Sequence, residues 1–287
     1  MRQIGNYDID DPAKIQGRDD VMVDDHSLAA LRLRAGLAAI SGCSGRVLVL
    51  GCGAGRYVRA IQRERPDLDV HGGDLSLTAL REARRRAPAG YVALDASALP
   101  YRDRSFSAVL FFDLLEHVPA AEAMVQEIAR ILVPTGVLHF FVPLEGKPDT
   151  LYGLLRHSER LPIHRWKRDH VGHVHQFTGA DVLRAVWAAG LTVTDVHYGF
   201  HIVGQIHDVI DYWQRERTRG GPGVVPPDAV RWIARIAFIP TWRLSYVEDR
   251  LYTGRRFGSG LYVTAVKPAD ATIGRRAGTG SMRVVGD

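Results

Sequence analysis

Three glycines that directly follow a short apolar segment are the residues most suggestive of chemistry. Residues 47–50 are all Val or Leu, and Gly51, Gly53 and Gly55 come next. A buried strand that runs into a tight glycine turn and then a helix lets a ligand approach the backbone closely. We therefore expect a nucleotide-like cofactor at this turn, although the glycines alone would also suit a simple strand-to-helix connection.

The spacing of these glycines argues against a dinucleotide. The dinucleotide fingerprint has a glycine at its sixth position, where a pyrophosphate meets the helix N-terminus, but Arg56 stands there. The spacing Gly-x-Gly-x-Gly suits a cofactor without phosphates whose amino-acid part passes over the loop. S-adenosylmethionine fits that description. An NAD-dependent reductase is also opposed by the lack of a Tyr-x-x-x-Lys pair.

Two aspartates follow the next predicted strands. Asp74 ends the second strand, 23 residues after Gly51, where its carboxylate can accept hydrogen bonds from both ribose hydroxyls. It would also suit a cap for the helix that starts near Ser76. Asp95 ends the third strand and could accept from an adenine amine, but an aspartate that only caps a loop would look similar.

Two further segments complete a series. Residues 111–118 read Phe-Phe-Asp-Leu-Leu-Glu-His-Val, and residues 128–136 read Ile-Ala-Arg-Ile-Leu-Val-Pro-Thr-Gly. The series resembles class I S-adenosylmethionine-dependent methyltransferases, particularly the small-molecule group that includes ubiquinone-biosynthesis-type O-methyltransferases. The resemblance covers about residues 46–198 and resumes at residues 261–268. It is specific for the cofactor and not for the substrate, because this fold hosts many acceptors.

The resemblance implies S-adenosylmethionine as the cofactor and ten cofactor-binding residues. The methionine part would lie against Gly51, Cys52, Gly53 and Gly55. The ribose would contact Asp74 and Leu75, and the adenine would contact Asp95 and Ala96. The sulfonium and the amino-acid group would lie beside Phe112 and Asp113. One departure is Val49, where the family often has an acidic residue. Recognition of the methionine ammonium would then rely on backbone carbonyls or on Asp113.

Candidate catalytic residues are histidines. Methyl transfer requires alignment of the acceptor and, for a hydroxyl, removal of its proton. His117 is the first candidate base, although it also suits a helix-start position in the family motif, and His175 is the second. His170, His173 and His175 are close enough in sequence to suggest a metal site or an imidazole pair. A metal would normally need a further carboxylate or thiolate at a fitting distance, so we assign no metal.

The elements that must position these residues alternate between strands and helices. Strands are predicted at residues 47–50, 69–73, 91–94, 106–112, 137–142, 191–198 and 260–266. Helices are predicted at residues 26–41, 56–64, 77–86, 120–131, 178–189, 203–215 and 227–251. This alternation predicts an α/β fold: a Rossmann-like, seven-stranded, mostly parallel sheet with helices on both faces, plus a mainly helical insertion or cap.

The predicted organisation has five parts. Residues 1–44 form an N-terminal helical extension, and residues 45–199 form the cofactor-binding core, with a cap segment at about 145–176. Residues 200–257 form a helical insertion that would serve as an acceptor lid, a dimer contact or a membrane-facing surface. Residues 258–268 supply the last strand of the core, and residues 269–287 form a disordered tail.

The composition of the chain indicates its cellular location and its classes of partner. The chain has 287 residues, a formal net charge of +5 and only two cysteines, Cys43 and Cys52, which do not form a Cys-x-x-Cys pair. We expect a reducing, cytoplasmic location. The first 25 residues lack a signal peptide, and no apolar run approaches the ~20 residues that span a bilayer, although peripheral membrane contact stays open. The arginines are scattered, so we expect no nucleic-acid partner.

Two functions stay open from the sequence. In the first, the protein is an enzyme that methylates oxygen, nitrogen or carbon of a small molecule, such as a lipid-like compound or a secondary-metabolite precursor, and a homodimer is compatible with it. In the second, it is a catalytically inactive, methyltransferase-like binding or assembly protein. Only Val49 supports the second function.

Overall fold

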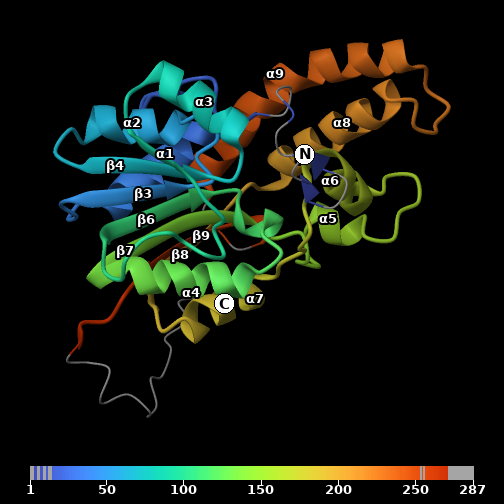
Figure 1. The fold of residues 1–287 in the computed structure, drawn as a ribbon. Helices are drawn as coiled ribbons and strands as arrows, with labels where there is room; N and C mark the ends of the chain where they lie inside the picture. The colour runs from blue at the N-terminus through green and yellow to red at the C-terminus, as the bar shows by residue number, and fades with distance from the viewer. Residues whose placement is uncertain are drawn as a thin grey trace.

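A seven-stranded sheet forms the centre of the molecule (Figure 1). The computed structural model describes residues 3–4, 7–8, 11, 15–252, 254 and 256–270. The strands lie in the order β5-β4-β3-β6-β7-β9-β8, and only β9 runs antiparallel to its neighbours. Their bounds are β3 Arg46–Leu50, β4 Asp69–Asp74, β5 Gly90–Ala93, β6 Phe106–Phe112, β7 Leu132–Pro143, β8 Thr192–Gly199 and β9 Gly260–Val266. This arrangement confirms the predicted fold class.

Strand β3, inside the sheet, leads to the point where a ligand can bind. Its residues 47–50 are at most 1% exposed, as expected for Val and Leu in a strand that is covered on both faces. The chain runs outward from β3 to β5 and then returns to β6 on the other side of β3. Ligands of such sheets bind beyond the carboxyl ends of the strands at this reversal point. The glycine turn after β3 lies at that point.

Helices cover both faces of the sheet. One face packs against α1 (Leu28–Ala39), α2 (Arg56–Glu64) and α3 (Leu77–Arg86), through a buried cluster that includes Leu33, Ile61 and Leu80. The other face packs against α4 (Ala121–Ile131) and α7 (Gly179–Ala188). Figure 1 shows these two groups on opposite sides of the sheet.

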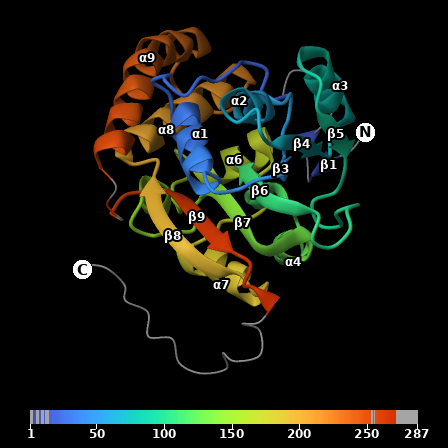
Figure 2. The same cartoon turned by 90° about the vertical axis from the view of Figure 1, so that its left-hand side faces the viewer.

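Four helices lie beyond one end of the sheet and form what we call the cap. They are α5 (Leu151–Leu154), α6 (Ile163–Val171), α8 (Ile202–Thr218) and α9 (Pro227–Leu251). The cap has a small core of its own in which Tyr152, Trp166 and Tyr212 are buried. Figure 2 shows α8 and α9 side by side. Large apolar side chains of α9 are exposed: Trp232, Ile233, Ile236, Ile239, Trp242, Leu244, Val247 and Leu251.

Several segments differ from the sequence-based expectations. The segment expected to be a helical extension contains α1, but it also contains two paired strands, β1 (Gln3–Ile4) and β2 (Tyr7–Asp8), and residues 15–27 are not helical. Strand β7 begins five residues earlier than predicted, because Leu132 already pairs with Phe106 of β6. Residues 271–287 of the predicted tail lie outside the described residues. In the described part of the chain, each helix is too short or too polar to cross a membrane.

Candidate functional site

The glycine loop lies open at the end of β3 and is tied to the end of β4. Gly51, Gly53 and Gly55 have φ of 62°, 53° and 85°, a left-handed conformation that favours glycine. The backbone N–H of Gly53 donates to Asp74 Oδ2 at 2.8 Å. Gly51 is exposed, whereas Cys52 is buried. The loop therefore presents backbone rather than side chains to a ligand.

An N-terminal strap, residues 15–21, covers one side of the glycine loop. The carbonyl of Gln16 accepts a hydrogen bond from Ala54 N at 2.8 Å, and a Cβ at Gly53 would lie 2.5 Å from the same carbonyl oxygen. Arg59 of α2 holds the strap with a 2.6 Å ion pair to Asp20, and the hydrogen bond from Arg59 lowers the pKa of that carboxyl. No local sequence pattern predicts this contact, because it joins segments about 40 residues apart.

The two aspartates differ in their surroundings. Asp74 ends β4 and accepts from Gly53 N and from Ser76 N, both at 2.8 Å, whereas the N-cap of α3 is Ser76, whose side chain accepts from Ala79 N. A carboxylate has room for further hydrogen bonds besides these two. Asp95 lies two residues beyond β5 and accepts from Ser97 N at 2.8 Å, which is the loop-capping arrangement. Asp95 is exposed, and Leu75 and Ala96 are partly buried.

Phe112 and Asp113 lie at the end of β6 beside a partly buried arginine that the sequence did not single out. Arg32 of α1 forms a 3.1 Å ion pair with Asp113, and its guanidinium lies 4.1 Å from the ring centroid of Phe141. Burial acts to lower the pKa of Arg32, but the charge of Asp113 together with smaller effects of Tyr57, Tyr262 and Asp249 outweighs burial and raises that pKa. Among the described residues, Arg32 Nε has no hydrogen-bond partner. A cation and a carboxylate thus meet at the end of the strand.

The two candidate bases, His117 and His175, contact different backbone carbonyls. His117 ends a short 3-10 turn, η2 (Leu115–His117), and its Nδ1 lies 3.2 Å from the carbonyl oxygen of Gly172. Because a carbonyl only accepts, Nδ1 carries the proton and the lone pair is on Nε2. Burial, with a smaller effect of His173, lowers the pKa of His117 to about 3. His175 Nε2 instead lies 3.0 Å from the carbonyl oxygen of Val118.

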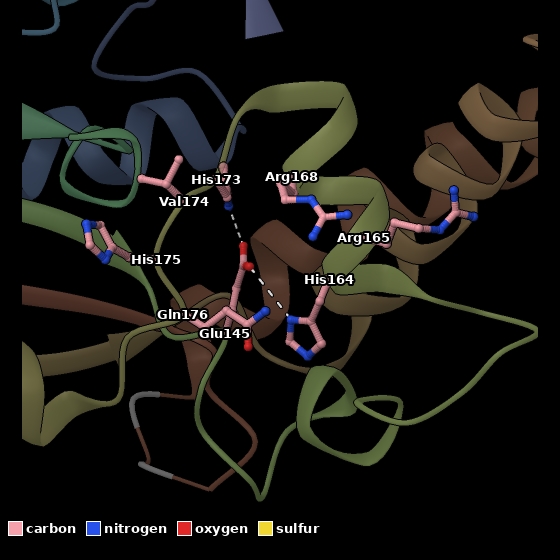
Figure 3. Close-up of a pocket in the computed structure, with 8 residues that line it drawn as sticks. All are labelled: Glu145, His164, Arg165, Arg168, His173, Val174, His175 and Gln176. Atoms are coloured by element: carbon pink, nitrogen blue, oxygen red, sulfur yellow. Dashed lines mark hydrogen bonds and ion pairs between the residues drawn. The ribbon is translucent and has the colours of Figure 1, made fainter. Parts of the chain in front are cut away.

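The three clustered histidines have different hydrogen-bond partners, although His173 and His175 line the same cavity. His170 lies 3.2 Å from Glu216 of α8, and His175 stacks on Phe177. His173 hydrogen-bonds through Nδ1 to Glu145, a buried carboxylate that sequence reasoning missed. Figure 3 shows His173 and His164 on either side of Glu145. A cavity of about 420 Å³ is lined by Glu145, His164, Arg165, Arg168, His173, Val174, His175 and Gln176.

Glu145 belongs to a buried charge network that joins the core to the cap. Lys167 of α6 lies 3.2 Å from Glu145 and 3.0 Å from Asp208 of α8, and Tyr152 donates to Asp208 at 2.7 Å. Burial acts to raise the pKa of Glu145, but the charges of Lys167 and His173 outweigh it and hold the pKa well below its usual value. Removing either member of such a buried pair would leave an uncompensated charge, so the network fixes how α6 sits.

Glu116 is a second buried carboxylate, and the sequence alone suggested no role for it. It is 1% exposed, and neither of its carboxylate oxygens has a hydrogen-bond partner within the described residues. Burial, with the charge of Asp113, raises its pKa well above the usual value. Its Oε1 lies 3.8 Å from His117 Nε2 and 3.9 Å from His173 Nε2. The sequence contained a signal for Glu116, since this residue directly precedes His117, the first candidate base.

Known proteins are similar to this chain in sequence and fold. Residues 48–140 match a family described as a methyltransferase domain. The chain is 30% identical over 176 residues to the ubiquinone/menaquinone biosynthesis C-methyltransferase of Desulfotalea psychrophila, which covers 57% of this chain and 71% of that protein. It is 28% identical over 183 residues to a ubiquinone biosynthesis O-methyltransferase of Neisseria meningitidis, covering 59% and 73%.

A solved structure shares the fold. Phosphoethanolamine N-methyltransferase 2 of Haemonchus contortus, in complex with S-adenosyl-L-methionine, aligns with a TM-score of 0.55 at 20% identity and covers 83% of this chain and 52% of that one. The three named proteins are C-, O- and N-methyltransferases. The similarity therefore leaves the atom that accepts the methyl group open.

Proposed function

Because the chain belongs to the class I S-adenosylmethionine-dependent methyltransferases, as an enzyme of their small-molecule group, we propose that it methylates a lipid-like acceptor. The observation that carries the proposal is the convergence of the glycine loop, Asp74, Asp113 and Arg32 at one edge of the sheet. The acceptor atom is oxygen, nitrogen or carbon. The alternative acceptor class is a precursor of a secondary metabolite.

The proposed cofactor contacts follow from the chemistry of each group. The exposed backbone of Gly51, with Cys52, Gly53 and Gly55, takes the methionine part. Asp74 and Leu75 take the ribose, and Asp95 and Ala96 take the adenine. Phe112 and Asp113 lie beside the sulfonium and the ammonium. We add Arg32, because its partly buried guanidinium pairs with Asp113 at this edge and suits the methionine carboxylate.

The chain's own residues would act on the acceptor. When bound, S-adenosylmethionine supplies an electrophilic methyl group that the acceptor atom displaces in line. The protein must hold the acceptor in that line and exclude water. For a hydroxyl acceptor a proton must leave, and Nε2 of His117 or Nδ1 of His175 carries the lone pair that can take it. The pKa of about 3 makes His117 a weak base, so a neutral amine acceptor demands less of it than a hydroxyl or a carbon acceptor, which must each lose a proton.

The lipid-like acceptor class rests on two observations. Similar proteins include the ubiquinone/menaquinone biosynthesis C-methyltransferase already described and a fatty-acid O-methyltransferase of Mycolicibacterium smegmatis, which is 29% identical over 165 residues. The cap also exposes a row of large apolar side chains on α9, including Trp232, Ile236 and Ile239. Exposed apolar side chains of this size commonly mark a surface that meets an apolar ligand, a membrane or another protein.

A labelled-methyl assay tests the proposal. The protein is incubated with methyl-labelled S-adenosylmethionine and cell extract, and the products are partitioned between organic and aqueous phases. Asp74→Ala serves as the cofactor-binding control, because it removes the acceptor for Gly53 N. Label in the organic phase with wild type only supports a lipid-like acceptor. Label in the aqueous phase rejects that class, and binding of the cofactor without any product across varied extracts favours the inactive binding protein.

A further inference from the structure

Glu116, His117 and His173 lie together at a buried point where the cap meets the core. Within the described residues, they are the group of His, Cys, Asp and Glu side chains whose ligand atoms all lie within 4.8 Å of one another. Glu116 and His117 come from η2, after β6, and His173 follows α6. We infer that these three side chains form a site for a divalent transition-metal ion, with Zn²⁺ as the best-fitting ion.

The orientation of both histidines supports this inference. Each ring uses Nδ1 for a hydrogen bond, His117 to the carbonyl oxygen of Gly172 and His173 to the carboxylate of Glu145. Both Nε2 atoms therefore carry the lone pair, and they lie 3.8 and 3.9 Å from the same oxygen of Glu116. Metal-binding histidines typically donate their second N–H to a carboxylate or a backbone carbonyl in this way, which fixes the ring and strengthens the ligand.

The unpaired carboxylate of Glu116 is the independent second observation. A buried polar group without a hydrogen bond is costly, and among the described residues neither oxygen of Glu116 has a partner. The distances of 3.8 and 3.9 Å to the two Nε2 atoms are too long for hydrogen bonds. Ligand atoms about 2.0–2.1 Å from a tetrahedral Zn²⁺ ion lie about 3.4 Å apart. Coordination would therefore require the two Glu116 distances to shorten by about half an ångström, and the two histidine ligand atoms, which lie within 4.8 Å of each other, to approach to the same separation.

A backbone hydrogen bond joins the two segments that supply the site, η2 and the residues after α6. The amide of Val174 donates to the carbonyl oxygen of Glu116 at 2.9 Å, so the segment after α6 is docked on η2. Two nitrogens and one carboxylate oxygen leave at least one coordination position open, which is the pattern of a non-structural site. Coordination would use the Nε2 lone pair of His117, and the ring could then not also serve as a general base.

Metal binding can be measured on the full chain without an acceptor, so the test does not depend on the proposed methyl transfer. Chelator-treated protein is titrated with Co²⁺, followed by visible absorption, and then with Zn²⁺ in competition. We expect one equivalent of saturable binding in wild type and its loss in Glu116→Gln and His173→Gln. His197→Gln is the matched control, because His197 also faces a carboxylate, at 3.1 Å, but lies on β8. It should bind as wild type does.

Glu145→Gln provides a graded test that keeps the three ligands in place. Loss of a carboxylate that orients a ligating histidine should weaken metal binding by about 10- to 100-fold. Binding of S-adenosylmethionine and the circular dichroism spectrum confirm that each variant is folded. The inference is overturned if wild type shows no saturable binding, or if folded Glu116→Gln and His173→Gln bind the ion as wild type does. If those two variants do not fold, an unchanged affinity in Glu145→Gln overturns it.

Discussion

Gly53→Ala tests the contact between the N-terminal strap and the glycine loop. The left-handed backbone, with φ of 53°, costs a residue with a Cβ roughly 1–2 kcal/mol. The new Cβ would also lie 2.5 Å from the carbonyl oxygen of Gln16. That carbonyl must move, and it would lose the hydrogen bond from Ala54 N, which contributes about 1 kcal/mol. The total expected loss is about 2–3 kcal/mol of the free energy of unfolding.

Gly190→Ala separates the backbone cost from the strap contact. Gly190 has a similar φ of 78°, but a Cβ there meets nothing within 4 Å, so only the backbone cost applies. Urea denaturation should give Gly53→Ala the larger loss by about 1 kcal/mol. Calorimetric titration should show weaker S-adenosylmethionine binding for Gly53→Ala only, since the strap borders the proposed methionine site. Equal stability losses and equal affinities in the two variants would refute the strap contact.

Three further predictions concern the site and its supports. Arg32→Gln should raise the Kd for S-adenosylmethionine about tenfold or more, because a hydrogen bond to a charged group contributes roughly 1.5–3 kcal/mol; Arg34→Gln, the neighbouring control, should bind normally, and equal effects would remove Arg32 from the site. Burial acts to lower the pKa of His201, but its hydrogen bonds to Asp249 and to the Gly254 carbonyl, together with the charges of Asp249 and Glu248, outweigh burial and raise the pKa. The stabilisation is therefore full below about pH 6.5 and is lost as the pH rises through the folded value. The free energy of unfolding should therefore fall more steeply above about pH 6.5 in wild type than in His201→Gln, and parallel pH profiles in urea denaturation would contradict this. Thr178→Ala should cost about 1 kcal/mol by removing the capping box of α7, whereas Thr178→Ser should retain most of it, and equal melting temperatures for the two variants would argue against the box.

The sequence by itself determined the fold class and the carboxyl ends of the strands that border the cofactor site. Residues 47–50 are apolar without alternation, which predicts a strand buried on both faces, and this strand is β3. The glycines after it predict a turn with left-handed backbone, which the structure contains. Such features are local: each follows from a few consecutive residues, so no knowledge of distant contacts is needed.

The tertiary structure alone decided which distant side chains meet. Arg32 reads as one polar position in a helix, but the packing of α1 on the sheet brings it to Asp113, 81 residues away. The spacing of His170, His173 and His175 suggested a shared site, yet the path of the chain after α6 turns them toward different partners. Glu116 and Glu145 lie far from His173 in sequence, and only the docking of the cap on η2 joins them. Sequence spacing within a loop does not fix side-chain direction, whereas burial and the available hydrogen-bond partners do.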